Sequence, residues 1–424
     1  MTKLRKVTAD TAREGAYTDQ DITALRDRLV DQLCIRSASV GMPLPPAVET
    51  ALRKVPRHLF TLGVPPESAY GTDSIVAKRD ERGVMLSTVS APPTVATMLA
   101  QAGPLDGTHV LEIGSGGYNA ALLRELVGPS GSVTTIDIDA DVVQRAEECL
   151  AAAGYDDVRV LCRDGEFGVS DTGRPFDLII VTAGAWDIPP AWTDQLAEGG
   201  RLVLPLRTFG LTRSWALERV SDHLESRSHL MCGFVPMQGA GGHQGHGVEL
   251  RGDQVGLWFD EVEHADTAAL GDVLATPRAE VWSGVTLGKG EPFHDLDLWL
   301  ATHLDGFAVL TAQQDAVDSG VVTPSWRLGT PAVADAATLA YRAKLRPVDA
   351  DKTTFEFGAY AHGPDAANLA VRFAEQIRQW DRHGRPAPHV TIHRSTTPIT
   401  DMPAGFVLHK RHTAIVLAWP HLAR

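Results

Sequence analysis

Residues 110–123 read VLEIGSGGYNAALL, and this stretch decides the fold class. An apolar run containing an acid is followed by three glycines within four positions and then by a helix-like segment. A strand, a glycine turn and a helix in this order are typical of a Rossmann unit, in which the turn lets a ligand approach the backbone. The spacing Gly114-x-Gly116-Gly117 is one residue shorter than G-x-G-x-G. The stretch alone therefore leaves open whether the loop still binds a cofactor.

Strand-like and helix-like patterns alternate on both sides of this loop. The expected strands cover 109–114, 132–138, 158–162, 176–184 and 201–206, and the expected helices cover 93–101, 119–127, 141–154 and 191–199. Such alternation predicts an open, mostly parallel sheet with helices on both faces. Two earlier helices are expected, one from Asp21 and one over 46–54. The predicted fold class is α/β, a Rossmann-like domain with N-terminal helices.

The length of 424 residues is enough for two domains. We expect a flexible tail over residues 1–20, a catalytic domain over 21–240 and an extra C-terminal α/β domain over 241–424. The glycine- and histidine-rich run 239–247 is the expected linker between these domains. An amphipathic helix is expected over 365–381 in the last domain.

The composition, 44% apolar and 22% charged, is that of a globular protein. A net charge of −14 argues against nucleic acid as a partner. The four cysteines form no C-x-x-C pair, which indicates reduced thiols and a cytoplasmic protein. No apolar stretch is long enough for a bilayer and no signal peptide is evident, so no membrane attachment is expected. His243 and His246 lack an acid or thiol nearby, so no metal site is expected.

Acids stand at the ends of three successive expected strands. Glu112 ends the first, Asp137 follows Gly114 by 23 positions, and Asp164 follows the third. Each alone reads equally well as a turn residue. Because the carboxyl ends of parallel strands meet at one edge, the three together favour a ligand site there. An acid before the glycine loop often marks a site for S-adenosylmethionine (SAM), which carries no phosphate, and the second acid suits the ribose hydroxyls.

Seven motifs follow one another in the chain: VPRHLF at 55–60, AY at 69–70, TVSAP at 88–92, GYNAA at 117–121, PFDLIIVTA at 175–183, GGRLVLPL at 199–206 and FVPMQG at 234–239. In these motifs the chain resembles protein L-isoaspartate O-methyltransferases, which use SAM to methylate a peptide carboxylate. The resemblance implies a class I SAM-dependent methyltransferase domain, with SAM as cofactor and S-adenosylhomocysteine (SAH) as product.

The resemblance also implies particular site residues. The substrate loop would consist of Thr88, Val89, Ser90, Ala91 and Pro92. The cofactor would be held by Glu112, Gly114, Ser115, Gly116, Gly117, Asn119, Asp137, Ile138, Asp164, Gly165 and Thr182. Ser90 is expected to be catalytic by orienting the carboxylate with its hydroxyl. Its alternative role is the N-cap of a helix that starts at Pro92 or Pro93, and the two roles are compatible.

Four departures separate the chain from ordinary repair enzymes. Ser87 stands where the family usually has Gln, the preceding segment 78–83 is charged, the cofactor loop is short, and the C-terminal domain is extra. In this two-domain form the chain resembles the methyltransferases associated with FxLD-type lanthipeptide clusters. That resemblance implies methylation of an Asp side chain in a modified precursor peptide, leading to aspartimide and isoaspartate. The C-terminal domain would then recognise the peptide.

Two other functions remain open at this point: general repair of isoaspartate in damaged proteins, and a non-catalytic escort that only binds a peptide. The basic run His409–His412 between two apolar strands is expected to be a solvated hairpin turn, with contact to an acidic peptide as the alternative. The oligomeric state does not follow from the sequence.

Overall fold

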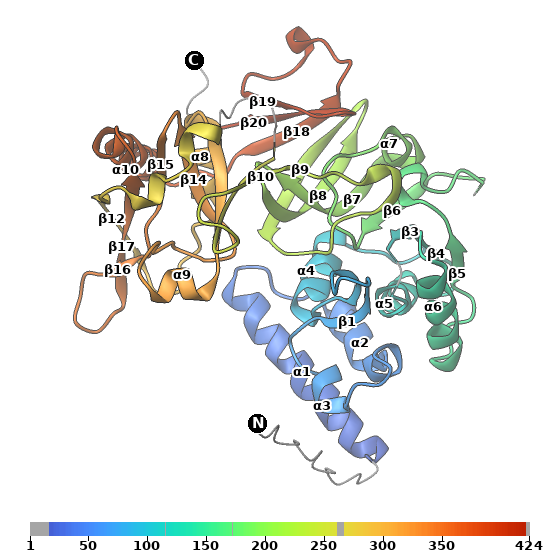
Figure 1. The fold of residues 1–424 in the computed structure, drawn as a ribbon. Helices are drawn as coiled ribbons and strands as arrows, with labels where there is room; N and C mark the ends of the chain where they lie inside the picture. The colour runs from blue at the N-terminus through green and yellow to red at the C-terminus, as the bar shows by residue number, and fades with distance from the viewer. Residues whose placement is uncertain (1–16, 115, 172, 261–266, 421–424) are drawn as a thin grey trace.

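The computed structural model describes residues 17–114, 116–171, 173–260 and 267–420 (Figure 1). The helices that precede the first sheet are α1 (Asp19–Ser39), α2 (Pro46–Lys54) and α3 (Pro66–Ala69). At the start of α1, Thr18 Oγ1 accepts a hydrogen bond from Asp21 N, and the Asp21 carboxylate accepts one from Thr18 N. This capping box begins the helix two residues before the expected start. Residues 19–20 are therefore helical rather than part of the expected tail, and residues 1–16 lie outside the described residues.

The first sheet has a parallel part in the order β5-β4-β3-β6-β7. Its strands are β3 (His109–Ile113), β4 (Ser132–Asp137), β5 (Arg159–Cys162), β6 (Phe176–Val181) and β7 (Leu196–Thr208). Its helices are α4 (Pro92–Ala102), α5 (Tyr118–Val127), α6 (Ala140–Ala152) and α7 (Pro190–Gln195). Successive side chains of β3 enter different cores, Val110 on the side of α5 and Leu111 on the side of α7. The predicted Rossmann-like α/β fold is confirmed.

The same sheet continues with antiparallel strands to ten strands within the described residues. These strands are β8 (Leu211–Val220), β9 (His223–Met231), β18 (His389–Arg394), β19 (Phe406–His409) and β20 (Thr413–Ala418). β18 pairs with β9, where Thr391 lies opposite Glu225, and β20 then pairs with β18. Figure 1 shows these C-terminal strands, in red, beside β9. The expected boundary at 241 therefore does not separate the two sheets along the chain, because the last strands return to the first sheet.

The second sheet is antiparallel, with the order β10-β11-β13-β14-β15-β17-β12 and β16 paired to β17. Its strands are β10 (His246–Glu249), β11 (Val255–Phe259), β12 (Ala279–Gly288), β13 (Phe307–Ala312), β14 (Thr330–Asp335), β15 (Thr338–Arg342), β16 (Arg346–Pro347) and β17 (Thr354–His362). Its helices are α8 (His294–His303), α9 (Gln314–Asp318) and α10 (Ala366–Arg382). The second sheet is thus inserted between β9 and β18 of the first.

The two sheets share one hydrophobic core. In α10, Leu369, Phe373 and Ile377 are buried as one stripe, which confirms the predicted amphipathic helix. They belong to the same buried cluster as Trp215 of the first sheet and Phe357 of the second. The second sheet is therefore packed onto the first through apolar contacts and is not tethered by a linker alone. Among the described residues, no helix is both long and apolar enough to cross a membrane.

Candidate active site

A cavity opens at the carboxyl ends of β3, β4 and β6, where the strand order of the parallel sheet reverses. Ligands bind at this edge in open α/β sheets. A small separate sheet covers it, formed by β1 (Ile75–Arg79) and β2 (Met85–Val89). The lining residues are Leu86, Ser87, Thr88, Val89, Ser90, Val95, Glu112, Ile113, Gly114, Gly116, Tyr118, Asn119, Ile136, Asp137, Ile138, Asp139, Val142, Gly165, Thr182, Ala183, Val235, Pro236, Met237 and Gln238.

Two glycines of the loop, Gly114 and Gly117, have backbone conformations that a side chain would strain. Gly114 has a φ of 101°, and a Cβ there would lie 2.8 Å from Thr182 Oγ1. The Thr182 hydroxyl donates to the Gly114 carbonyl and so fixes the start of the loop. Gly117, with a φ of 81°, is the N-cap of α5, and a Cβ there would lie 3.2 Å from Phe60. The shortened loop therefore still turns directly into α5, while Ser115 lies outside the described residues.

Glu112 is buried at the bottom of the cavity, with 1% of its surface exposed. Its Oε2 accepts a hydrogen bond from Thr135 Oγ1 at 2.5 Å, and its Oε1 accepts one from Asn119 Nδ2 at 2.9 Å. Burial raises the pKa of Glu112 to about 7, although both hydrogen bonds lower it. A cationic group of a ligand beside this carboxylate would stabilise its ionised form.

The end of β4 supplies a second acid to the cavity. Asp137 Oδ1 accepts a hydrogen bond from Asp139 N at 2.9 Å, and Asp139 caps α6 by accepting from Asp141 N at 3.0 Å. Ile138 lies between these acids and is 40% exposed, so an apolar surface faces the cavity. An acid suited to ribose hydroxyls and an apolar side chain beside it fit the nucleoside part of SAM.

The third strand end differs from the expectation. The Asp164 carboxylate does not line the cavity but accepts hydrogen bonds from Glu166 N at 3.0 Å and from Ala240 N at 2.9 Å. Gly165 lines the cavity instead, and a Cβ there would lie 2.5 Å from Ile113 Cγ2. Asp164 thus shapes this wall through backbone groups, and its direct contact with the cofactor stays a prediction.

The expected substrate loop lies at the mouth of the cavity. Thr88, Val89 and Ser90 line it, whereas Ala91 and Pro92 do not. α4 begins at Pro92 with Ala91 as its N-cap and without a side-chain cap among the described residues. The interpretation of Ser90 as an N-cap is therefore wrong, because the helix begins one residue too late for it.

A buried arginine that the sequence analysis did not single out as a site residue holds this loop. Arg57 of VPRHLF is fully buried, and its Nη2 donates to the Ser90 carbonyl at 2.9 Å. Its Nε donates to the Ala69 carbonyl at 2.8 Å, and its guanidinium lies 4.8 Å from the Tyr118 ring. One side chain thereby joins its own motif to three of the other sequence motifs. The motif itself was the signal, because a charged residue among apolar ones needs buried partners.

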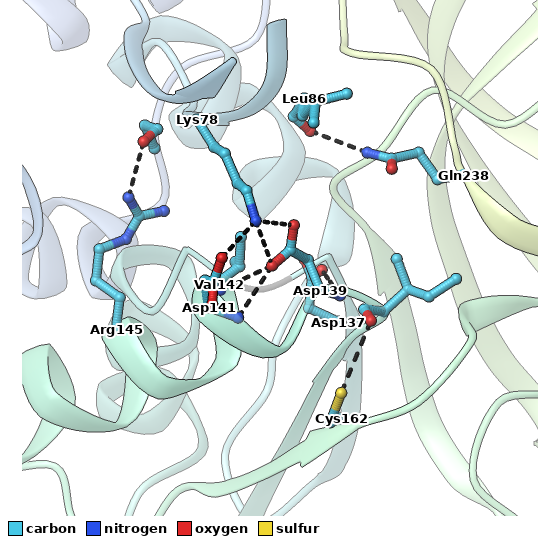
Figure 2. A network of polar contacts seen from close by, with 11 residues as sticks. Lys78, Leu86, Asp137, Asp139, Asp141, Val142, Arg145, Cys162 and Gln238 are labelled. Carbon is cyan, nitrogen blue, oxygen red and sulfur yellow. Dashed lines mark hydrogen bonds and ion pairs between the residues drawn. The ribbon is translucent and has the colours of Figure 1, made fainter. Parts of the chain in front are cut away.

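A second residue missed from the sequence fixes the covering hairpin. Figure 2 shows Lys78 of β1 reaching Asp139, at 2.6 Å, and Asp141, at 2.7 Å. Gln238 donates to the Leu86 carbonyl at 3.2 Å and holds β2 from the other side. The charged segment 78–83, noted as a departure in the sequence, is the signal that could have identified this contact.

Other polar groups lie outside the cavity. His229, His294 and Asp295 have the spacing of metal ligands, but none of them lines the cavity. His229 Nε2 lies 2.7 Å from Asp295 Oδ1, and the buried Arg213 donates to the His294 carbonyl. A cation beside Arg213 would be repelled, so the contact between His229 and Asp295 explains the group without a metal.

The sheet, the glycine loop and the acids at its strand ends define a Rossmann-like methyltransferase that uses SAM. The sequence model of the family "Protein-L-isoaspartate(D-aspartate) O-methyltransferase (PCMT)" matches residues 28–241, and the chain belongs to this family. It is a SAM-dependent protein carboxyl O-methyltransferase. The predicted enzyme class, cofactor and family are thereby confirmed.

The chain is also similar to individual relatives and, more distantly, to solved structures. The protein-L-isoaspartate O-methyltransferase of Methanopyrus kandleri is 36% identical over 232 residues, 54% of this chain and 98% of the relative. The second such enzyme of Archaeoglobus fulgidus is 36% identical over 223 residues, 52% of this chain and 95% of the relative. A solved protein-L-isoaspartate O-methyltransferase aligns with a TM-score of 0.48 and 20% identity, over 86% of this chain and 96% of that chain. A Plasmodium falciparum structure, solved with SAH, aligns with a TM-score of 0.43 and 18% identity, over 50% of this chain and 98% of that chain.

Proposed function

We propose that this enzyme methylates the side-chain carboxylate of an Asp in a modified, ribosomally made precursor peptide of the lanthipeptide kind, leading to aspartimide and isoaspartate. The observation that carries the proposal is the second sheet, since residues 242–424 lie outside the family match. A repair enzyme needs to contact only an altered residue and its neighbours. A dedicated maturation enzyme needs a further surface that distinguishes its precursor from other peptides.

The residues of the cavity support methyl transfer to a carboxylate. A carboxylate with a pKa near 4 is ionised at pH 7, so no general base is needed. When bound, SAM supplies a methyl group on a sulfonium. A carboxylate oxygen of the substrate would form a bond to that methyl carbon as the bond from carbon to sulfur breaks, and SAH would leave. In the proposed mechanism the Ser90 hydroxyl donates to the other carboxylate oxygen and Arg57 holds the Ser90 backbone.

Orientation and exclusion of water supply the acceleration. The reaction transfers a methyl group from a sulfonium to a carboxylate and removes both charges, so a dry cavity favours it. A well-oriented pair of reactants gains roughly 7–11 kcal/mol over the same pair free in water. The hairpin β1–β2, held by Lys78 and Gln238, covers the cavity and limits the access of water.

The ester then reacts without further residues of the enzyme. The backbone amide nitrogen after the methylated Asp attacks the ester carbonyl, methanol leaves, and an aspartimide remains. A small residue after the Asp, Gly above all, leaves this nitrogen accessible. We therefore propose an Asp-Gly pair as the target and the C-terminal domain as the part that recruits the peptide. A cytoplasmic location stays a prediction.

General repair of isoaspartate is the second candidate, and the family's description favours it. Family membership leaves the non-catalytic escort without support, and binding of SAH in a calorimetric titration would exclude it. The deciding experiment treats three peptides with SAM and the enzyme: a ring-free isoaspartyl peptide, a cyclised precursor, and that precursor with its target Asp changed to Asn. Mass spectrometry should show one added methyl and then net loss of one water for the unchanged precursor alone. Equal methylation of the isoaspartyl peptide, whatever the rings, would establish repair instead.

A further inference from the structure

The turn between β19 and β20, residues 409–413, lies against the catalytic part of the chain. We call it the C-terminal turn. It lies beyond the family match of 28–241, yet its neighbours in space are the segment after β6, β7 and the segments around residues 166 and 240. The expected solvated turn is therefore wrong in one respect, because Lys410 is only 7% exposed.

Lys410 anchors the C-terminal turn to the segment after β6. Its Nζ donates to the backbone carbonyls of Trp186 and Arg207, and it lies 4.9 Å from the centre of the Trp186 ring. Burying an ammonium group is costly unless it is hydrogen-bonded and paired with favourable charge. These contacts satisfy the ammonium group of Lys410, so the C-terminal turn is fixed to the segment after β6.

Asp187 makes the same connection from the other side. Its Oδ2 accepts a hydrogen bond from His412 N at 2.6 Å, and its Oδ1 accepts one from Thr413 Oγ1 at 2.5 Å. Its Oδ1 also accepts from Ile188 N at 2.8 Å, within its own segment. A carboxylate that is 91% buried thus depends on the C-terminal turn for two of its partners.

The segment after β6 is also a wall of the cavity. Thr182 and Ala183 line the cavity directly. Gly184 N donates to the Val235 carbonyl at 2.8 Å, and Met237 N donates to the Gly184 carbonyl at 2.9 Å. Val235 and Met237 line the cavity too, so the anchored segment holds a second wall in place.

Two outer contacts reach the third wall. His412 Nε2 lies 3.2 Å from Glu166 Oε1, next to Gly165, which lines the cavity. Arg411 Nη1 donates to the Ala240 carbonyl at 3.1 Å. The backbone amide of Ala240 in turn donates to the Asp164 carboxylate. Both contacts end on segments whose geometry Asp164 sets.

We propose that the C-terminal turn is a positioning device for cofactor binding, and that Lys410, Arg411 and His412 are its positioning residues. It acts through the backbone of three cavity walls and touches neither reactant. The catalytic site is then incomplete without residues that lie some 170 positions beyond the family match. This role is independent of which peptide is methylated.

The test is the double variant Arg411→Ala/His412→Ala, which leaves the buried anchors Lys410 and Asp187 intact. We expect the dissociation constant of SAH, measured by calorimetry, to rise about tenfold, which corresponds to about 1.4 kcal/mol. The KM for SAM should rise in parallel, while kcat at saturating SAM and the unfolding midpoint stay close to those of the wild type. The variant Arg411→Lys/His412→Gln keeps a donor at both positions and should restore SAH binding.

Arg394→Ala is the matched control. It removes an exposed ion pair between β18 and Asp194 of α7, whose partners are 53% and 54% exposed and do not line the cavity. It should leave SAH binding unchanged. Wild-type affinity for SAH in the double variant, or an equal loss in the control, would overturn the proposal. A lowered unfolding midpoint with unchanged affinity would show that the turn supports only the fold.

Discussion

Glu112→Gln should stabilise the enzyme without cofactor at pH 8 and weaken its binding of SAH. The carboxyl of Glu112 is buried, and its pKa is raised to about 7 from an ordinary value of 4.5. Between pH 4.5 and 7 the unfolded chain therefore releases a proton that the folded chain keeps. Stability contributed by this group is present below pH 4.5 and is lost as the pH rises to 7.

The magnitude follows from the shift. A difference of 2.5 pKa units corresponds to about 3 kcal/mol at 1.36 kcal/mol per unit. Glutamine has the same shape and no charge, and its carbonyl can accept the hydrogen bond from Thr135. Its amide can donate to Asn119 once the Asn119 side-chain amide is turned over. The variant therefore avoids most of the cost above pH 7.

Urea denaturation of both proteins at pH 5 and pH 8 measures the effect. The free energy of unfolding of Glu112→Gln should exceed that of the wild type by up to about 3 kcal/mol at pH 8, and by much less at pH 5. SAH should bind the wild type with release of a proton at pH 6, visible in buffers of different ionisation enthalpy, and this release should vanish in the variant. A variant less stable than the wild type at pH 8 would refute the reasoning, since burial of charge would then not dominate at this position.

Four further outcomes are expected. Ser90→Ala should lower kcat by about 10-fold or more, because one hydrogen bond to a charged group is lost. The affinity for SAH should stay within about twofold of the wild type. A loss of SAH affinity without a loss of kcat would contradict the role of Ser90. Gly114→Ala should abolish SAH binding in calorimetry, because its Cβ would lie 2.8 Å from a hydroxyl at a φ of 101°, and wild-type binding would show that the loop can shift. Lys78→Ala should raise the KM for SAM several-fold by freeing the hairpin from α6, whereas Arg79→Ala, which loses a contact within the hairpin, should not. Phe373→Ala should lower the free energy of unfolding by about 3–5 kcal/mol in urea, because a fully buried ring leaves a cavity in the shared core.

Much of the catalytic half is readable from local sequence. Periodicity predicted the succession of strands and helices along the chain. The positions of Glu112 and Asp137 at strand ends predicted that they lie at one site, and both line the cavity. The glycine spacing after the first strand identified Gly114 and Gly117, because the turn there needs positive φ angles that glycine adopts easily. The amphipathic α10 followed from a 3.6-residue period. In each case the pattern needs only residues within one or two turns of each other.

Contacts between distant segments were decided by the tertiary structure. An apolar strand pattern says which side chains share a face but not which strand is the neighbour, so the pairing of β18 with β9 could not be inferred. For the same reason His409–His412 read as a solvated turn, although Lys410 is buried against backbone carbonyls some 200 residues earlier. The sequence could not show that the Asp164 carboxylate accepts a hydrogen bond from Ala240 N, because Ala240 lies 76 positions away. The fold class and the family could both be predicted from the sequence, since both depend on the local order of elements and on short motifs. Only the three-dimensional packing decided which of the remaining polar residues hold the walls of the cavity, because a buried charge is placed by its partners and these are distant in the chain.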